Sequence, residues 1–188
     1  MYKRQRQLWA EGRASFAGEH YQVDGAICRP LPLQDGGIPL WIAGGGERKT
    51  LKIAAKYAQY TNFDGTLDAF THKSKILAGH CTDLGRDFGS ITRSANYNVV
   101  IGATAGDVED KLDWVRAHYA RVLPSRADST REQLATGPAV GTPEQIGETL
   151  RGLADAGMTY AICYFLDAAY DPSSMELFER EVIPALAD

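Results

Sequence analysis

A run of glycines, Gly44 to Gly46, is the stretch of this 188-residue sequence best suited to bind a charged ligand. It follows the short apolar segment 38–43 and precedes a segment with helical spacing, so it is expected to link a strand to a helix. Backbone N–H groups at a helix start lack partners, and the helix dipole favours an anion there. Arg48 and Thr50 add a positive charge and a hydroxyl. This pattern predicts a phosphate site.

The same glycines have a second interpretation, in which they only allow a turn with positive φ. The run matches neither the dinucleotide-binding fingerprint nor the P-loop, because Gly-Lys-Ser/Thr is missing. Spacing alone therefore leaves a phosphate site and a purely conformational turn equally open.

Other chemistry-bearing residues give weaker signals. His72 and His80 lie eight residues apart on a predicted surface helix, and no metal-ligand spacing such as HExxH occurs, so no metal site is expected. A Gly-x-Ser-x-Gly elbow is also missing, which disfavours a serine hydrolase of that type. Asn62, Asp64 and Asp167 follow predicted strand ends, where loops carry function, although each also suits an ordinary turn.

Composition limits the class of protein. The chain is 44% hydrophobic and 23% charged, which is ordinary for a globular protein, and we expect a single domain over residues 1–188. The formal charge of −4 argues against a nucleic-acid partner. No apolar run approaches the length that spans a bilayer, so no membrane association is expected. Cysteines at 28, 81 and 163 fit neither disulfides nor zinc, which favours the cytoplasm.

Strand and helix patterns alternate along the chain and predict an α/β fold with a parallel sheet. A small β-hairpin is expected first, from residues 14–16 and 21–23. Strand-to-helix units follow it, with strands expected at 38–43, 60–63, 96–101 and 158–165. Segment 123–138 is polar and predicted to be a mobile loop. Periodicity does not decide between an open sheet and a barrel.

Several short motifs occur in a definite order. They are Leu8-Trp9, Ser15-Phe16-Ala17-Gly18-Glu19-His20-Tyr21, Cys28-Arg29-Pro30-Leu31-Pro32-Leu33-Gln34, Ile38-Pro39-Leu40-Trp41-Ile42-Ala43-Gly44-Gly45-Gly46-Glu47-Arg48-Lys49-Thr50-Leu51, His80-Cys81, Gly85-Arg86-Asp87 and Gly141-Thr142-Pro143-Glu144-Gln145-Ile146. Their order resembles the luciferase-like monooxygenase family, especially its branch that uses the deazaflavin coenzyme F420. The resemblance covers nearly the whole chain.

The resemblance implies a partial TIM barrel, in which this chain supplies strands five to eight with their helices after a small β-hairpin. In the family, the loop after the fifth strand helps to hold the cofactor phosphate. The residues that match this loop are Gly44, Gly45, Gly46, Glu47, Arg48 and Thr50. The implied cofactor is coenzyme F420, with FMN as the alternative, and its ring chemistry is hydride transfer to or from a small organic substrate.

Two departures from the family matter. Family members usually carry Ala-Asp-Gly-Trp-Asn at the sixth strand, whereas this chain has Ala58-Gln59-Tyr60-Thr61-Asn62. The first four strands, which carry much of the ring-facing chemistry, are not in this sequence, so catalytic residues are not assigned. We therefore expect a homo-oligomer or a complementary half-barrel chain as partner. The alternative is a truncated, non-catalytic paralogue that serves as a cofactor-binding or interaction module.

Overall fold

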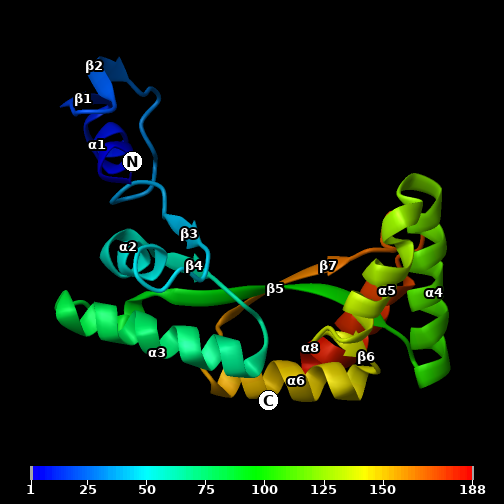
Figure 1. Ribbon diagram of the computed structural model, residues 1–188. Coiled ribbons are helices and arrows are strands. Elements are labelled where there is room, and N and C mark those ends of the chain that lie inside the picture. Colours follow the sequence, from blue (N-terminus) through cyan, green and yellow to red (C-terminus); the bar gives the residue numbers. More distant parts are fainter. Residues whose placement is uncertain (1, 188) are drawn as a thin grey trace.

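The computed structural model describes residues 2–187 and shows an α/β fold built on a parallel sheet (Figure 1). The strands of the sheet are β3 (Trp41–Ala43), β4 (Tyr60–Asn62), β5 (Thr92–Ile101) and β7 (Tyr160–Phe165), and the short strand β6 (Val140–Gly141) pairs with the end of β5. β4 pairs with β3 and with β5, and β7 pairs with β5, all in parallel. The predicted parallel α/β architecture is confirmed.

Helices connect successive strands, as parallel pairing requires. They are α2 (Thr50–Tyr57), α3 (Leu67–Asp83), the 3-10 turn η1 (Phe88–Ser90), α4 (Ala105–Val122), the 3-10 turn η2 (Pro124–Arg126), α5 (Ala127–Ala135) and α6 (Pro143–Asp155). A capping box opens α6: the Gln145 side chain accepts a hydrogen bond from the backbone N–H of Thr142 (2.9 Å). The predicted start of this helix is therefore confirmed.

One face of the sheet packs against helices and forms the core. Leu51 and Ala54 of α2, Phe70 of α3 and Ile146 of α6 are completely buried there, because apolar residues at three- and four-residue spacing place one helix face on the sheet. Tyr97 of β5 is buried among them. Figure 1 shows α3 and α6 on this side of the sheet.

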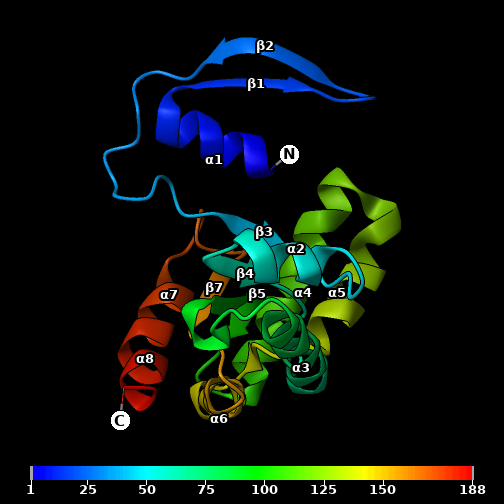
Figure 2. The ribbon, with the colours of Figure 1, turned by 90° about the vertical axis from the view of Figure 1, so that its left-hand side faces the viewer.

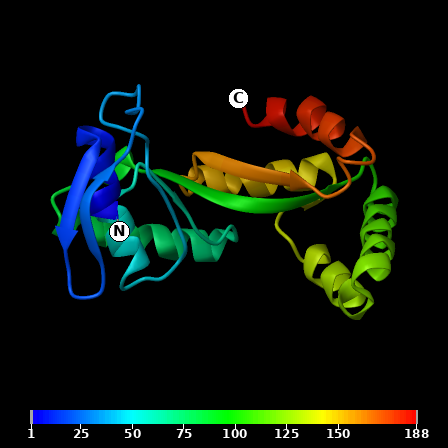
Figure 3. The ribbon, with the colours of Figure 1, turned by 90° about the horizontal axis from the view of Figure 1, so that it is seen from above.

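The opposite face of the sheet is open over its middle. Strand residues alternate between the two faces, so the neighbours of the core residues point away from the helices. Trp41, Tyr160 and Tyr164 are 41%, 48% and 53% exposed on this face. Within the described chain no helix lies over β5 and β7 when the molecule is viewed from above (Figure 3). In a closed barrel this face would be the interior.

The sheet does not close within residues 2–187. β3 pairs only with β4, and β7 pairs only with β5, so both remain edge strands in the described part of the chain. This agrees with a partial barrel. No helix among these residues is both long enough and apolar enough to cross a membrane.

The predicted hairpin is confirmed and stands apart from the sheet. Helix α1 (Tyr2–Glu11) precedes β1 (Arg13–Ala17) and β2 (Gln22–Ile27), which pair in antiparallel register. Figure 2 shows α1 packed under the hairpin, with the sheet below both. The connection to β3 is a long irregular segment. That residues 1–188 form one domain stays a prediction.

The prediction of a mobile loop over residues 123–138 is wrong. Most of it is helical, as η2 and α5, and the end of α5 is buried through Leu134. Arg131 of α5 forms ion pairs with Glu109 and Asp113 of α4, both at 2.6 Å. These contacts between α4 and α5 fix a segment whose polar composition alone indicated a loop.

The last helical segment is continuous but contains a π-helical turn. It consists of α7 (Ser173–Leu177), a π-helical turn η3 (Phe178–Val182) and α8 (Ile183–Ala185). Pro184 lies in α8, directly after the π-helical turn, and the helix continues past it. The π-helical turn buries Phe178 and Val182 in the core.

Candidate functional site

The glycine loop lies directly after β3, at the carboxyl end of the sheet. Gly44 has a φ of +114°, a conformation that favours glycine, and its backbone N–H donates to the carbonyl oxygen of Asn62 (2.8 Å). This bond ties the start of the loop to the end of β4. The positive φ expected for a conformational turn is therefore present at Gly44.

The loop also leaves a row of backbone donors free. Leu51 donates to the carbonyl oxygen of Gly46 (3.0 Å), and α2 begins at Thr50, four residues after the glycine run. Within residues 2–187, the backbone N–H groups from Gly45 to Arg48 form no hydrogen bond. Unpartnered N–H groups in front of a helix are the donors that an anion uses.

Gly45 and Gly46 have no side chain that could cover this row of donors. A Cβ atom at Gly46 would lie 2.8 Å from Oγ1 of Thr50, and one at Gly45 would lie 3.3 Å from Cε of Lys73. The Thr50 hydroxyl and the Lys73 chain therefore border the glycines closely. Arg48 is exposed beside them. The loop thus combines free N–H groups with a hydroxyl and cationic side chains.

The Glu47 carboxylate contacts side chains of α3. Its Oε1 atom accepts from Nζ of Lys73 (2.6 Å) and lies 3.0 Å from Nε2 of His72. The bond from Lys73, and then that from His72, lower the pKa of the Glu47 carboxyl. His80 adds a contact between its Nε2 atom and the Glu47 carbonyl oxygen (2.8 Å). The Glu47 side chain therefore anchors the loop to α3, while its backbone N–H stays without a partner in the described chain.

Polar side chains line the open face next to the loop. The Asn62 side-chain amide donates to Oγ of Ser94 (3.0 Å) and to Oδ1 of Asn96 (2.9 Å). A cavity of about 310 Å³ lies at the carboxyl end of β4, and one of about 430 Å³ borders the middle of β5; Asn96 and Pro138 line both of them. Carboxyl ends of parallel strands are where α/β barrels bind ligands.

The other residues singled out from the sequence separate in the structure. Asp64 accepts hydrogen bonds from the backbone and hydroxyl of Thr66, as a turn residue does. Asp167 lies at the end of β7 and pairs with Lys111 (3.0 Å). Neither joins the glycine loop. Among residues 2–187, no group of three metal-ligating side chains comes together.

Sequence reasoning missed Lys73 and Asn96. Lys73 follows Glu47 by 26 positions, and nothing in its own helix pattern distinguishes it from a solvated lysine. Asn96 could have been found, because strand alternation in β5 places it on the face opposite to the buried Tyr97.

Comparison with known proteins gives a consistent family. Residues 2–160 match the family model described as luciferase-like monooxygenase. An F420-dependent glucose-6-phosphate dehydrogenase from Rhodococcus hoagii is 25% identical over an alignment of 203 positions. The alignment covers 96% of this chain and 57% of the relative. Pyrimidine monooxygenase RutA from Stutzerimonas stutzeri is 29% identical over 146 residues, 69% of this chain and 38% of that protein.

Solved structures share the fold. An F420-dependent secondary alcohol dehydrogenase, in complex with an F420-acetone adduct, aligns with a TM-score of 0.76 and 16% identity, over 100% of this chain and 60% of its own. The coenzyme F420-dependent tetrahydromethanopterin reductase from Methanopyrus kandleri aligns with a TM-score of 0.74 and 17% identity, over 95% and 60%.

The chain thus spans a little over half the length of the dehydrogenase and reductase that it resembles. The family match covers most of the chain and agrees with the order of strands, helices and hairpin described above. This chain belongs to the luciferase-like monooxygenase family.

Proposed function

We propose that this chain is the cofactor-phosphate-binding part of an oxidoreductase that uses coenzyme F420 or FMN. The observation that carries the proposal is the row of free backbone N–H groups from Gly45 to Arg48, in front of α2. Four consecutive donors, the positive end of a helix and the Arg48 side chain suit a phosphate monoester or diester. Relatives that use F420 lend support to that cofactor, and FMN stays the alternative.

The residues of this chain fit the phosphate end of either cofactor. Gly44, Gly45 and Gly46 expose the backbone, Thr50 offers its hydroxyl, and Arg48 offers its charge. Glu47 contributes its backbone N–H, while its negative charge is compensated by Lys73 and His72. When bound, the cofactor supplies hydride transfer, and the protein orients its ring.

A small organic substrate belongs, in this proposal, next to the loop on the open face. The cavity beside Asn62 and Asn96 lies at the carboxyl end of β4, and Asn62 is bonded to Gly44 of the glycine loop. The amide groups of Asn62 and Asn96 can donate and accept hydrogen bonds, so they suit a neutral polar group such as an alcohol or a carbonyl. Substrate identity depends also on the other half of the barrel.

The exposed aromatic face indicates a partner. The Trp41 and Tyr60 rings stack at 4.8 Å between centroids, and Tyr160 meets Trp41 edge-on at 5.2 Å. Exposed aromatic rings and two unpaired edge strands are features that another polypeptide usually covers. We propose a complementary half-barrel that pairs with β3 and β7. Every relative named above is described as an enzyme, so we do not propose the non-catalytic module.

The phosphate site is tested with FMN and riboflavin, which differ only by the phosphate. We expect the full chain to bind FMN at least about tenfold more tightly, a difference of about 1.4 kcal/mol, measured by flavin fluorescence. Gly46→Asp places a carboxylate among the donors and should remove this preference. Gly79→Asp makes the same change in α3, where a Cβ would meet nothing within 4 Å, and should keep it. Equal affinity for FMN and riboflavin in the native chain would refute the site.

The partner is tested by sedimentation of the full chain, alone and after mixing with the first four strands of a relative as a separate polypeptide. A heterodimer that brings Trp41 into an apolar environment supports a complementary half-barrel. A homodimer that does not exchange with the added half would favour a second copy instead.

A further inference from the structure

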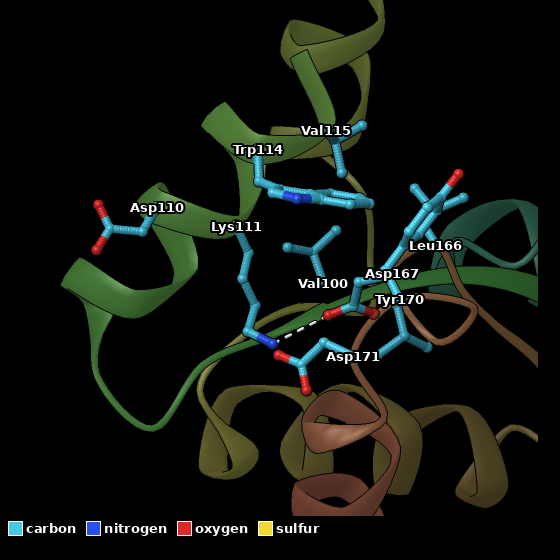
Figure 4. A pocket seen from close by; sticks show the side chains of 10 residues that line it. Val100, Asp110, Lys111, Trp114, Val115, Leu166, Asp167, Tyr170 and Asp171 are labelled. Atoms are coloured by element: carbon cyan, nitrogen blue, oxygen red, sulfur yellow. Dashed lines mark hydrogen bonds and ion pairs between the residues drawn. The ribbon is translucent and has the colours of Figure 1, made fainter. Parts of the chain in front are cut away.

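A cavity on the far side of the molecule from the glycine loop has a ligand chemistry of its own. It has a volume of about 240 Å³ and lies between α4 and the segment that follows β7 (Figure 4). Val100 lies beneath the Trp114 indole of α4, and Tyr170 lies beside that indole. None of the residues from Gly44 to Thr50 lines it, so it is separate from the proposed phosphate site.

The charges around this cavity are predominantly negative. Lys111 is the cation that lines it in the described chain, and its Nζ atom lies 3.0 Å from Oδ2 of Asp167. The Ser174 hydroxyl donates to the same oxygen. Asp171 lies close to Asp167 and Lys111 (Figure 4) and accepts from the backbone and the hydroxyl of Ser173. These bonds lower the pKa of the Asp171 carboxyl and keep it ionised at neutral pH.

Free acceptor capacity remains on both carboxylates. Oδ1 of Asp167 receives no hydrogen bond from residues 2–187, and each oxygen of Asp171 accepts one bond while it has room for another. The net charge of Lys111, Asp167 and Asp171 is −1, and Asp110 at the rim adds a further negative charge. An anion would be repelled here.

The position of the cavity in the barrel is also informative. Many TIM barrels bind phosphate between strands seven and eight, which correspond here to β5 and β7. In this chain the Asp167 carboxylate occupies that position and takes the donors of Lys111 and Ser174 for itself. The place where other barrels hold an anionic ligand is therefore filled by a negative side chain.

Aromatic rings complete the cavity. Trp114 and Tyr170 contact each other edge-on, with centroids 5.6 Å apart, and His118 stacks on Trp114 at 5.2 Å. The Trp114 and Tyr170 rings are 37% and 68% exposed, so a ligand can reach them. Aromatic faces next to carboxylates attract organic cations, since the ring quadrupole and the negative charge act together.

We propose that this cavity binds a small organic cation, an amine or quaternary ammonium compound with an apolar body, against the Trp114 and Tyr170 rings and with its charge toward Asp167 and Asp171. The apolar body contacts Val100 and the indole. The positive group takes the free lone pairs of the two carboxylates.

The test compares three probes of similar shape by calorimetry on the full chain: benzylamine as the cation, benzyl alcohol as the neutral analogue and benzoate as the anion. Benzylamine should bind at least about tenfold more tightly than benzyl alcohol, and benzoate should not bind. Added salt should weaken the binding of benzylamine and leave that of benzyl alcohol unchanged.

Variants locate the site. Trp114→Leu should weaken benzylamine binding by about tenfold, and Asp171→Asn by about threefold or more, whereas Asp83→Asn at the end of α3 removes the same charge and should have no effect. Thermal unfolding checks that each variant is folded. Equal binding of benzylamine and benzyl alcohol, preferential binding of benzoate, or native affinity in both Trp114→Leu and Asp171→Asn would overturn the proposal.

Discussion

Replacing Gly44 by alanine tests whether the glycine loop needs its left-handed backbone. Gly44 has a φ of +114°, and its N–H is held by the carbonyl oxygen of Asn62. The new Cβ would lie 3.4 Å from Cγ2 of Thr50, which is ordinary contact. The cost of Gly44→Ala therefore comes from backbone strain rather than from crowding.

The magnitude follows from two opposing effects. A non-glycine residue in a sparsely populated backbone region costs about 1–3 kcal/mol. Loss of glycine freedom in the unfolded chain returns about 0.4–1 kcal/mol. We expect Gly44→Ala to lower the free energy of unfolding by about 1–2 kcal/mol, a substantial part of the 5–15 kcal/mol typical of a domain.

A matched substitution makes the measurement decisive. Gly79 lies within α3, where a Cβ meets nothing within 4 Å, so Gly79→Ala should raise the free energy of unfolding by about 0.5–1 kcal/mol. Urea unfolding followed by circular dichroism compares both variants with the native chain. If Gly44→Ala is as stable as Gly79→Ala, then the positive φ at Gly44 is not required and the account of the loop is wrong.

Three further predictions concern the elements that hold the loop. Leu51→Ala should cost about 2–5 kcal/mol in urea unfolding, because Leu51 is completely buried, and a cost below about 1 kcal/mol would contradict the packing of α2. Arg86→Met should lower the free energy of unfolding by about 1–3 kcal/mol, because the Arg86 guanidinium donates to the carbonyl oxygens of Ala55 and Ala58 at the end of α2. Arg86→Lys keeps the charge but not the several N–H donors of the guanidinium, so it should recover only part of this free energy. The pKa of the Glu47 carboxyl is lowered from 4.5 in the folded state, so its pairing stabilises the fold above that value and is lost as pH falls below it. Lys73→Met should move the pKa of Glu47 upward in an NMR titration, and an unchanged pKa would exclude Lys73 as the main cause.

Local patterns in the sequence were sufficient for the elements that depend on local interactions. The Thr142 to Gln145 capping box predicts its helix because both partners lie in one turn. The glycine run predicts a turn between β3 and α2 for the same reason, since a left-handed residue is needed wherever the chain reverses so sharply. The hairpin around Gly18 follows equally from nearby residues.

Contacts between distant segments could not be predicted in this way. Segment 123–138 reads as a polar loop, yet Arg131 reaches Glu109 and Asp113 on the preceding helix and makes part of it helical. Glu47 stays a predicted cofactor-binding residue, but no local pattern indicates that Lys73 and His72 hold its side chain on α3. In both cases the deciding charge lies 18 or more residues away, beyond the range of any periodic pattern.

The stacked pair of Trp41 and Tyr60 has a practical consequence for the study of this chain. The Trp41 indole is 41% exposed on the open face, whereas Trp9 and Trp114 lie on other elements. A variant that keeps Trp41 as its single tryptophan carries an intrinsic optical reporter on the edge strand β3. When another polypeptide covers this face, the emission of Trp41 shifts to the blue, so the assembly of the barrel can be timed without any external label.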